Sequence, residues 1–261
     1  MIRALWSAAT GMKAQQTNLD VIANNLANVN TSGFKKQRAD FQDLVYQIDR
    51  EPGAPVEPGS TVPTGVQVGL GSRVAGTGRM MGQGSAQVTE NPTDIMIQGP
   101  GFFQVILPDG STAYSRNGAF QIDGQGQFVT TDGYLLEPSI AVPEDAVELT
   151  VSDTGIVSVK IPGDVLFQEI GQIELARFVN PPGLLAQGKS LFLETDASGA
   201  PMTAYPGEDG MGTIIQGALE MSNVQVVEEM VAMITAQRAY EAGSKAVKTA
   251  DDMLAIANSM K

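Results

Sequence analysis

The side chains that most often carry catalysis are only partly represented in this sequence. Histidine and cysteine are both absent, which excludes Ser/His/Asp and Cys/His sites and removes the usual ligands of transition metals. Paired carboxylates could still support acid–base chemistry such as polysaccharide cleavage, and the pairs considered for it are Glu144/Asp145, Glu208/Asp209 and Asp251/Asp252. Neighbours on a strand or helix point in different directions, so solvated surface explains these pairs better. We therefore expect no catalytic residue, no metal site and no enzymatic activity.

Two glycine clusters, Gly76 with Gly78 and Gly99 with Gly101, could be taken for phosphate-binding loops. Neither precedes a predicted helix whose N-terminus would hold the anion, and the GxxxxGK[ST] pattern is missing. The segment 123–132 lacks the alternating acidic ligands and the final glutamate of a calcium loop. Hairpin turns explain the segment 123–132 better, and we expect no cofactor.

The formal net charge of -13 is unevenly distributed over the 261 residues. Residues 67–221 contain 18 acidic and 6 basic residues, a net charge of -12, so the two end segments together contribute only -1. An acidic middle limits nonspecific association, whereas nearly neutral ends suit helices that pack against further copies of themselves. Nucleic acid is not expected as a partner, because no basic stripe is available for phosphate contacts.

The sequence predicts neither a cleavable signal peptide nor a membrane span. Polar residues such as Lys13, Gln15 and Asp20 interrupt the first 30 residues, where a signal peptide would need an apolar run of about 7–15 residues. No stretch approaches the roughly 20 continuous apolar residues of a membrane helix. If the protein leaves the cytoplasm, we expect export by a route that does not use such a signal.

Both ends of the chain are predicted to form long amphipathic helices, over residues 1–33 and 218–261. Apolar residues repeat every seven positions in one seam of each helix: Leu5, Met12, Leu19 and Leu26, and Val226, Met233, Tyr240, Val247 and Leu254. Ile22 lies in a second N-terminal seam, and a column of small residues, Ala236, Gly243, Ala250 and Ala257, indicates a close helix contact. Ser222 or Asn223 could cap the second helix. Heptads report packing and not partners, so two helices of one soluble bundle remain an equal alternative.

The sequence pattern changes twice in the middle of the chain. Residues 34–71 are predicted to be an extended connecting segment with a Pro/Gly-rich insertion, which could be disordered or a rigid contact to a neighbouring subunit. Residues 72–217 show short apolar runs separated by turn signals such as Asp109-Gly110, which predicts an antiparallel β domain. The expected fold class is α+β, in which the long terminal helices pair as a coiled-coil-like assembly domain and an antiparallel all-β domain is inserted between them.

The segment 23–35, ANNLANVNTSGFK, resembles the signature of the flagellar basal-body rod and hook family. The residues that carry this resemblance are Asn24, Asn25, Leu26, Asn28, Thr31, Gly33 and Phe34. The segments GPGFFQV at 99–105, YSRNGAFQIDGQGQFVTTDGYLL at 114–136 and NVQVVEEMVAMITAQRAYEAGSKAVKTADDML at 223–254 are also similar to that family.

The resemblance implies a structural subunit of the distal part of the flagellar rod, a helical tube that transmits motor torque to the hook. The insertion after Tyr46 favours the distal over the proximal rod. The implied partners are further copies of the chain, the proximal rod proteins, the hook protein, the outer-membrane and peptidoglycan ring proteins and the flagellar export apparatus. The implied location is the flagellar basal body, spanning the periplasm. The alternatives are a proximal-rod or hook member of the family and, in another class, a peptidoglycan-active enzyme.

Self-assembly is expected to use apolar residues of the two terminal helices. The single tryptophan, Trp6, fits an interface better than a membrane or carbohydrate anchor, because large aromatics supply much of the contact energy in assemblies. The expected interface consists of Leu5, Trp6, Met12, Leu19, Ile22, Leu26, Met233, Tyr240, Val247 and Leu254.

Overall fold

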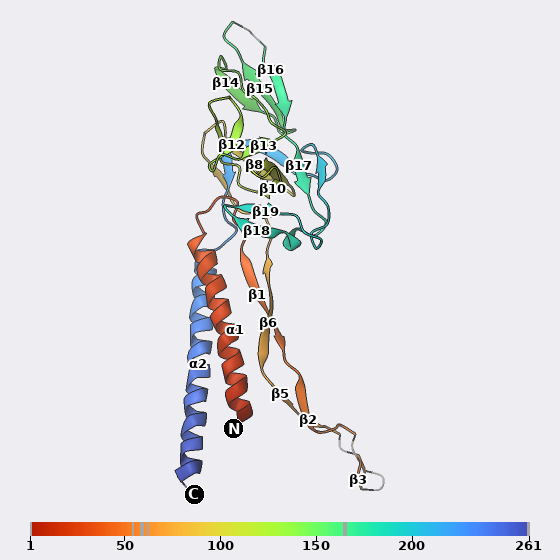
Figure 1. Cartoon of the computed structure of the whole chain (residues 1–261), viewed down its shortest axis with the longest axis vertical. Helices are drawn as coiled ribbons and strands as arrows, with labels where there is room; N and C mark the ends of the chain where they lie inside the picture. The colour runs from red at the N-terminus through yellow and green to blue at the C-terminus, as the bar shows by residue number, and fades with distance from the viewer. Residues whose placement is uncertain (1, 54, 58–59, 62, 164–165, 260–261) are drawn as a thin grey trace. The chain divides into compact units, whose positions relative to one another are not determined.

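The computed structural model describes residues 2–53, 55–57, 60–61, 63–163 and 166–259 (Figure 1). The chain divides into two compact units. The helix unit comprises residues 1–27, 37–78 and 225–261, and the β unit comprises residues 28–36 and 79–224. Each unit is therefore built from segments that lie far apart in the sequence.

Two long helices dominate the helix unit. Helix α1 spans Ile2–Ala27 and helix α2 spans Val226–Ser259. At about 1.5 Å per residue they are about 39 Å and about 51 Å long. They run antiparallel and side by side, so the two ends of the chain lie at the same end of the pair (Figure 1).

The rest of the helix unit consists of paired strands. Strand β1 (Gln37–Asp43) pairs with β6 (Ser72–Arg79), and β1 also contacts α1. Two further antiparallel pairs follow, which are β2 (Tyr46–Arg50) with β5 (Val66–Gly69) and β3 (Pro55–Glu57) with β4 (Ser60–Thr61). The described residues of the predicted connecting segment thus form strands. The insertion also contains residues 54, 58–59 and 62, which lie outside the described residues. For these residues, disorder stays a prediction.

The helices are shorter than predicted at the ends that face the middle of the chain. Helix α1 ends at Ala27 and not at 33, because residues 28–36 fold with the β unit. The predicted caps of α2 are wrong. Asn223 Oδ1 instead accepts a hydrogen bond from the Lys36 backbone N–H (2.7 Å), Ser222 Oγ accepts one from the Val224 N–H (3.3 Å), and α2 begins only at Val226.

In its described residues, the β unit contains a nine-stranded sheet and three smaller ones, and the strand pairs are antiparallel, as expected. In the large sheet the order is β11-β12-β13-β9-β10-β19-β18, and β17 joins β9 to β20. The strands of this sheet are β9 (Phe102–Ile106), β10 (Thr112–Ser115), β11 (Phe120–Ile122), β12 (Phe128–Thr130), β13 (Leu135–Glu137), β17 (Leu175–Arg177), β18 (Leu185–Gly188), β19 (Leu191–Leu193) and β20 (Met202–Ala204). The smaller sheets are β14-β15-β16 (Glu148–Val151, Ile156–Lys160, Gln168–Gln172), β8-β21 (Ile95–Gln98, Thr213–Gln216) and β7-β22 (Ala86–Val88, Ala218–Glu220).

The core of the β unit follows from the alternation of apolar residues in its strands. Val157 and Val159 on β15 are fully buried, as their spacing of two residues predicts. Phe103 and Phe120 meet edge to face with ring centroids 5.1 Å apart, and both are buried. The α+β class, with terminal helices and a central antiparallel β region, is confirmed. The main segment of the β unit covers residues 79–224, and residues 28–36 join it, whereas the sequence predicted a β domain over 72–217.

Candidate assembly site

Helices α1 and α2 approach each other closely at Gly243. A Cβ atom on Gly243 would lie 2.7 Å from Met12 Cγ and 3.9 Å from the Ala8 carbonyl oxygen, so a larger residue there must displace Met12. Ala236 and Ala250, one heptad before and after Gly243, are each 3% exposed. Gly243 itself is half-buried and Ala257, the last member of the column, is exposed, so the column of small residues is covered from Ala236 to Ala250 only.

The structure separates the predicted interface residues by their burial. Ile22 is buried, whereas Trp6 and Tyr240 are 62% and 42% exposed. The other seven are half-buried, namely Leu5, Met12, Leu19, Leu26, Met233, Val247 and Leu254. Within one chain the two helices thus cover part of this set and leave its two large aromatics open to solvent.

A second apolar surface on α2 was missed by the heptad analysis. Its members, the α2 row, are 74%, 52%, 57% and 49% exposed, and they are Val227, Met230, Val231 and Ile234. Successive helical residues are rotated by about 100°, so this row lies roughly opposite the face that buries Ala236. The sequence signal for this row is the spacing of three and four residues between its members. Because the row lies next to the heptad seam, its residues are easily assigned to that seam.

The signature residue Asn25 connects three elements of the helix unit. Its side-chain amide donates to the Gln37 carbonyl oxygen (2.8 Å) and to Glu229 Oε2 (3.0 Å), and its oxygen accepts from the Gln37 N–H (2.9 Å). Asn25 and Glu229 are 1% and 2% exposed. Because these bonds run from α1 to β1 and to the first turn of α2, Asn25 fixes where the two helices meet.

The signature continues as a tight turn in the β unit. The Thr31 backbone N–H and hydroxyl donate to the backbone and side-chain oxygens of Asn28, both at 3.2 Å, and the Phe34 N–H donates to the Thr31 carbonyl (3.3 Å). Gly33 has a φ of +71°, and a Cβ there would lie 2.6 Å from the Asn117 backbone nitrogen. Only glycine fits this position. The remaining signature residues are the exposed Asn24, the half-buried Leu26 and the half-buried Phe34.

Three ionised side chains are buried together beside this turn, and we call them the ion cluster: Lys35, Arg116 and Glu220. Lys35 Nζ lies 2.6 Å from Glu220 Oε1, and Arg116 Nε lies 2.9 Å from Glu220 Oε2. The three residues are 1%, 5% and 2% exposed. Burial lowers the pKa of both Lys35 and Arg116, and the Glu220 carboxylate opposes that shift in each case.

Sequence analysis did not single out the ion cluster, although each member lies in a segment that it quoted or next to one. Lys35 ends the signature, Arg116 belongs to YSRNG, and Glu220 shares a face of β22 with the buried Ala218. A charged residue at an inward-facing strand position was the available signal, since such a residue needs a buried partner.

The residues considered for chemistry do not form a reactive site. All three acid pairs lie on the surface. Asp123 Oδ1 accepts the backbone N–H groups of Gln125 and Gln127, each at 2.8 Å, which is a turn between strands β11 and β12 as expected. No cluster of three metal-ligating side chains occurs among the described residues. Over the same residues, no helix is both long and apolar enough to cross a membrane.

Comparison with known proteins assigns this architecture to the flagellum. Three families match: "Flagella basal body rod protein" at residues 5–35, "Flagellar hook protein FlgE/F/G D1 domain" at 96–159 and "Flagellar basal body rod FlgEFG protein C-terminal" at 215–260. The matches cover α1 with the signature, the central strands and α2. They define a structural protein of the flagellar rod and hook class.

Relatives of nearly equal length narrow this class. A flagellar basal-body rod protein FlgG from Borreliella burgdorferi is 52% identical over 100% of this chain and 99% of its own. One from Caulobacter vibrioides is 50% identical over 97% of each chain. A flagellar hook protein FlgE from Helicobacter pylori is 40% identical over 52% of this chain but only 19% of its own. The chain therefore belongs to the FlgG family of flagellar basal-body rod proteins. It is a structural subunit of the basal body, and not an enzyme.

Proposed function

We propose that this chain builds the distal rod by assembling into a helical tube that transmits motor torque to the hook. In the tube, α1 and α2 pair as a coiled-coil-like inner layer, and the β unit faces outward. Under this proposal, the chain consists of terminal assembly helices, a connecting segment and a β domain. This organisation separates the parts that form contacts from the parts that face outward.

The α2 row is the observation that carries this proposal. Its four side chains are apolar, consecutive on one helical face and about half or more exposed in the single chain. Fully burying a side chain of this size contributes about 1.5–3 kcal/mol. An unpartnered apolar face on a helix favours association, and a weak contact repeated over many copies becomes cooperative.

The ten predicted interface residues divide into two roles under this proposal. Trp6 and Tyr240 are exposed and available to neighbouring subunits. The half-buried and buried members, from Leu5 to Leu254, stabilise the α1–α2 pair that presents those aromatics. Signature residues act before assembly, because Asn25 joins the ends of the two helices and Gly33 fixes the turn in the β unit within one subunit.

The proposed partners follow from the place of the distal rod. They are further copies of the chain, the proximal rod proteins at one end, the hook protein at the other, the ring proteins of the peptidoglycan and outer membrane around it, and the export apparatus that delivers it across the periplasm. Rod membership is better supported than hook membership, since the rod relatives align over both whole chains and the hook relative does not.

A paired charge substitution in the α2 row tests the proposal. In the full-length variant Met230→Glu/Ile234→Glu we expect a folded subunit that no longer enters rods, because two buried carboxylates at each contact disfavour association. Glutamate is a good helix former, so α2 itself is retained. Motility should be lost, and isolated basal bodies should lack the chain.

The matched control is Thr235→Glu/Ala239→Glu, which adds the same charge at the same spacing on another exposed face of α2. The control is expected to support motility. If the control and the α2-row variant assemble equally well, the α2 row is not an assembly surface.

A further inference from the structure

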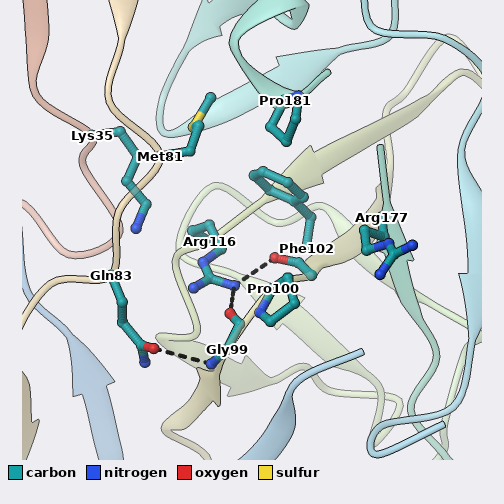
Figure 2. Close-up of a pocket in the computed structure, with 10 residues that line it drawn as sticks. Lys35, Met81, Gln83, Gly99, Pro100, Phe102, Arg116, Arg177 and Pro181 are labelled. Atoms are coloured by element: carbon teal, nitrogen blue, oxygen red, sulfur yellow. Dashed lines mark hydrogen bonds between the residues drawn. The ribbon is translucent and has the colours of Figure 1, made fainter. Parts of the chain in front are cut away.

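A cavity of about 250 Å³ adjoins the ion cluster within the β unit (Figure 2). Its apolar wall is formed by Met81, Pro100, Phe102 and Pro181. Three cationic side chains also line it, and they are Lys35, Arg116 and Arg177. An apolar wall with a few convergent charged groups is the usual composition of a binding pocket.

Among the described residues, the positive charge at this cavity exceeds the negative charge paired with it. Glu220 is the only carboxylate that pairs with Lys35 or Arg116 among the described residues, so the ion cluster holds two cations and one anion. Burying an unmatched charge is unfavourable, and a second carboxylate would remove that excess. Arg177 adds a further cation on the wall, and its hydrogen bond from Nη1 to the Gly210 carbonyl is long, at 3.4 Å.

Arg116 retains hydrogen-bonding capacity on the cavity side. Its Nε donates to Glu220, and its Nη1 donates to the carbonyls of Gly99 (2.8 Å) and Gly101 (2.6 Å), which Figure 2 shows. Nη2 makes no hydrogen bond within the described part of the chain. No fully buried side-chain nitrogen or oxygen there lacks a partner, so Nη2 is not fully buried. Its two N–H groups can donate charge-assisted hydrogen bonds to a carboxylate.

The surrounding surface identifies the source of that carboxylate. Residues 67–221 carry a net charge of -12 and only 6 basic residues, and Arg116 and Arg177 are two of these. Outward-facing units of neighbouring subunits therefore present carboxylates to one another. A cationic cavity is the place where such a carboxylate would be attracted and not repelled.

We propose that the cavity receives an aspartate or glutamate side chain from a neighbouring copy of this chain. Arg116 and Arg177 bind the incoming carboxylate, Lys35 and Glu220 hold Arg116 in position, and Phe102 and Met81 contact the methylene groups. This inference rests on the proposed function, since it names a contact between subunits of the assembled rod.

Site-specific photo-cross-linking tests the occupant. The full-length chain with p-benzoylphenylalanine at Met81, or in a second version at Pro181, is produced in cells and irradiated within basal bodies. We expect a band at twice the mass of the chain, with mass spectrometry joining position 81 or 181 to an acidic peptide of a second copy. Rods that assemble without this dimer, or that cross-link to another protein, overturn the inference and leave the proposed function intact. A chain that never enters rods, even with natural Met81 and Pro181, contradicts the proposed function instead.

A charge reversal provides the second measurement. Arg177→Glu should leave the subunit folded, because Arg177 is only half-buried and lies outside the ion cluster, and it should reduce the cross-link yield at least about fivefold. Lys160→Glu makes the same charge change on β15, away from the cavity lining, and should leave the yield unchanged. Equal yields from the two variants would show that the positive charge of the cavity does not bind the neighbour.

Discussion

Replacing Glu220 with alanine is expected to destabilise the β unit by about 3–5 kcal/mol, the usual cost of removing one partner from a buried ion pair. Glu220 is 2% exposed and is the only paired carboxylate of Lys35 and Arg116 among the described residues. Its removal leaves both cations buried without an anion. Its carboxylate also accepts the Gly84 N–H (2.8 Å), which would lose its partner too.

Urea unfolding of the full-length chain, followed by circular dichroism at β-sheet wavelengths, measures this effect. Glu148→Ala is the matched control, because Glu148 lies in a strand of the same unit, its side chain is 57% exposed and it is 4.0 Å from Lys160. Exposed pairs contribute about 0–1 kcal/mol, so the control should unfold close to the natural chain. A loss below about 1 kcal/mol for Glu220→Ala would mean that the ion cluster does not stabilise the β unit.

The second large effect is expected at Gly33, where alanine should cost more than about 3 kcal/mol. A positive φ alone costs an alanine about 1–2 kcal/mol. The larger part comes from space, since the new Cβ would lie 2.6 Å from the Asn117 nitrogen and 2.7 Å from the Arg116 carbonyl carbon. These are backbone atoms and cannot rotate away. Relieving the overlap therefore moves Arg116, which displaces its guanidinium from Glu220.

Gly53→Ala separates the two contributions to that cost. Gly53 has a similar φ, +83°, but no heavy atom lies within 4 Å of a Cβ built there. The control should lose only the conformational part, measured by the same urea titration. Equal losses for the two alanine variants would contradict the packing role assigned to Gly33.

Local periodicity explains why the helices and the β class could be predicted. The seven-residue repeats of Leu5 to Leu26 and of Met233 to Leu254 extend over several turns, and the alternation of Val157 and Val159 marks a strand with one buried face. Such patterns depend on neighbours within one element. They require no knowledge of what the element packs against.

The end of the first helix, the limits of the β unit and the ion cluster could not be predicted in this way, because they depend on contacts between residues far apart in the sequence. Lys35 and Glu220 are separated by 185 positions, yet their side chains pair. Residues 28–33 were predicted as the end of the first helix, but the Gly33 N–H donates to the Glu220 carbonyl (2.8 Å), and residues 28–36 belong to the β unit. Long-range pairing overrode the local helix signal at these residues.

The predicted assembly residues show the same limit. A heptad states that a face is buried but not by which partner, and the structure buries Ile22 while leaving Trp6 and Tyr240 exposed. The α2 row lay outside the seam altogether. The sequence does not say which face of α2 packs against α1. The structure shows that this is the face with Gly243, and the α2 row lies on another face.

A cryo-EM reconstruction of the assembled rod tests the central claim, that the terminal helices are the elements of self-assembly. We predict that α1 and α2 form the inner layer, with the α2 row, Trp6 and Tyr240 buried against neighbouring subunits. A rod in which Val227, Met230, Val231 and Ile234 remain exposed, and in which the β units make all contacts between subunits, would contradict it.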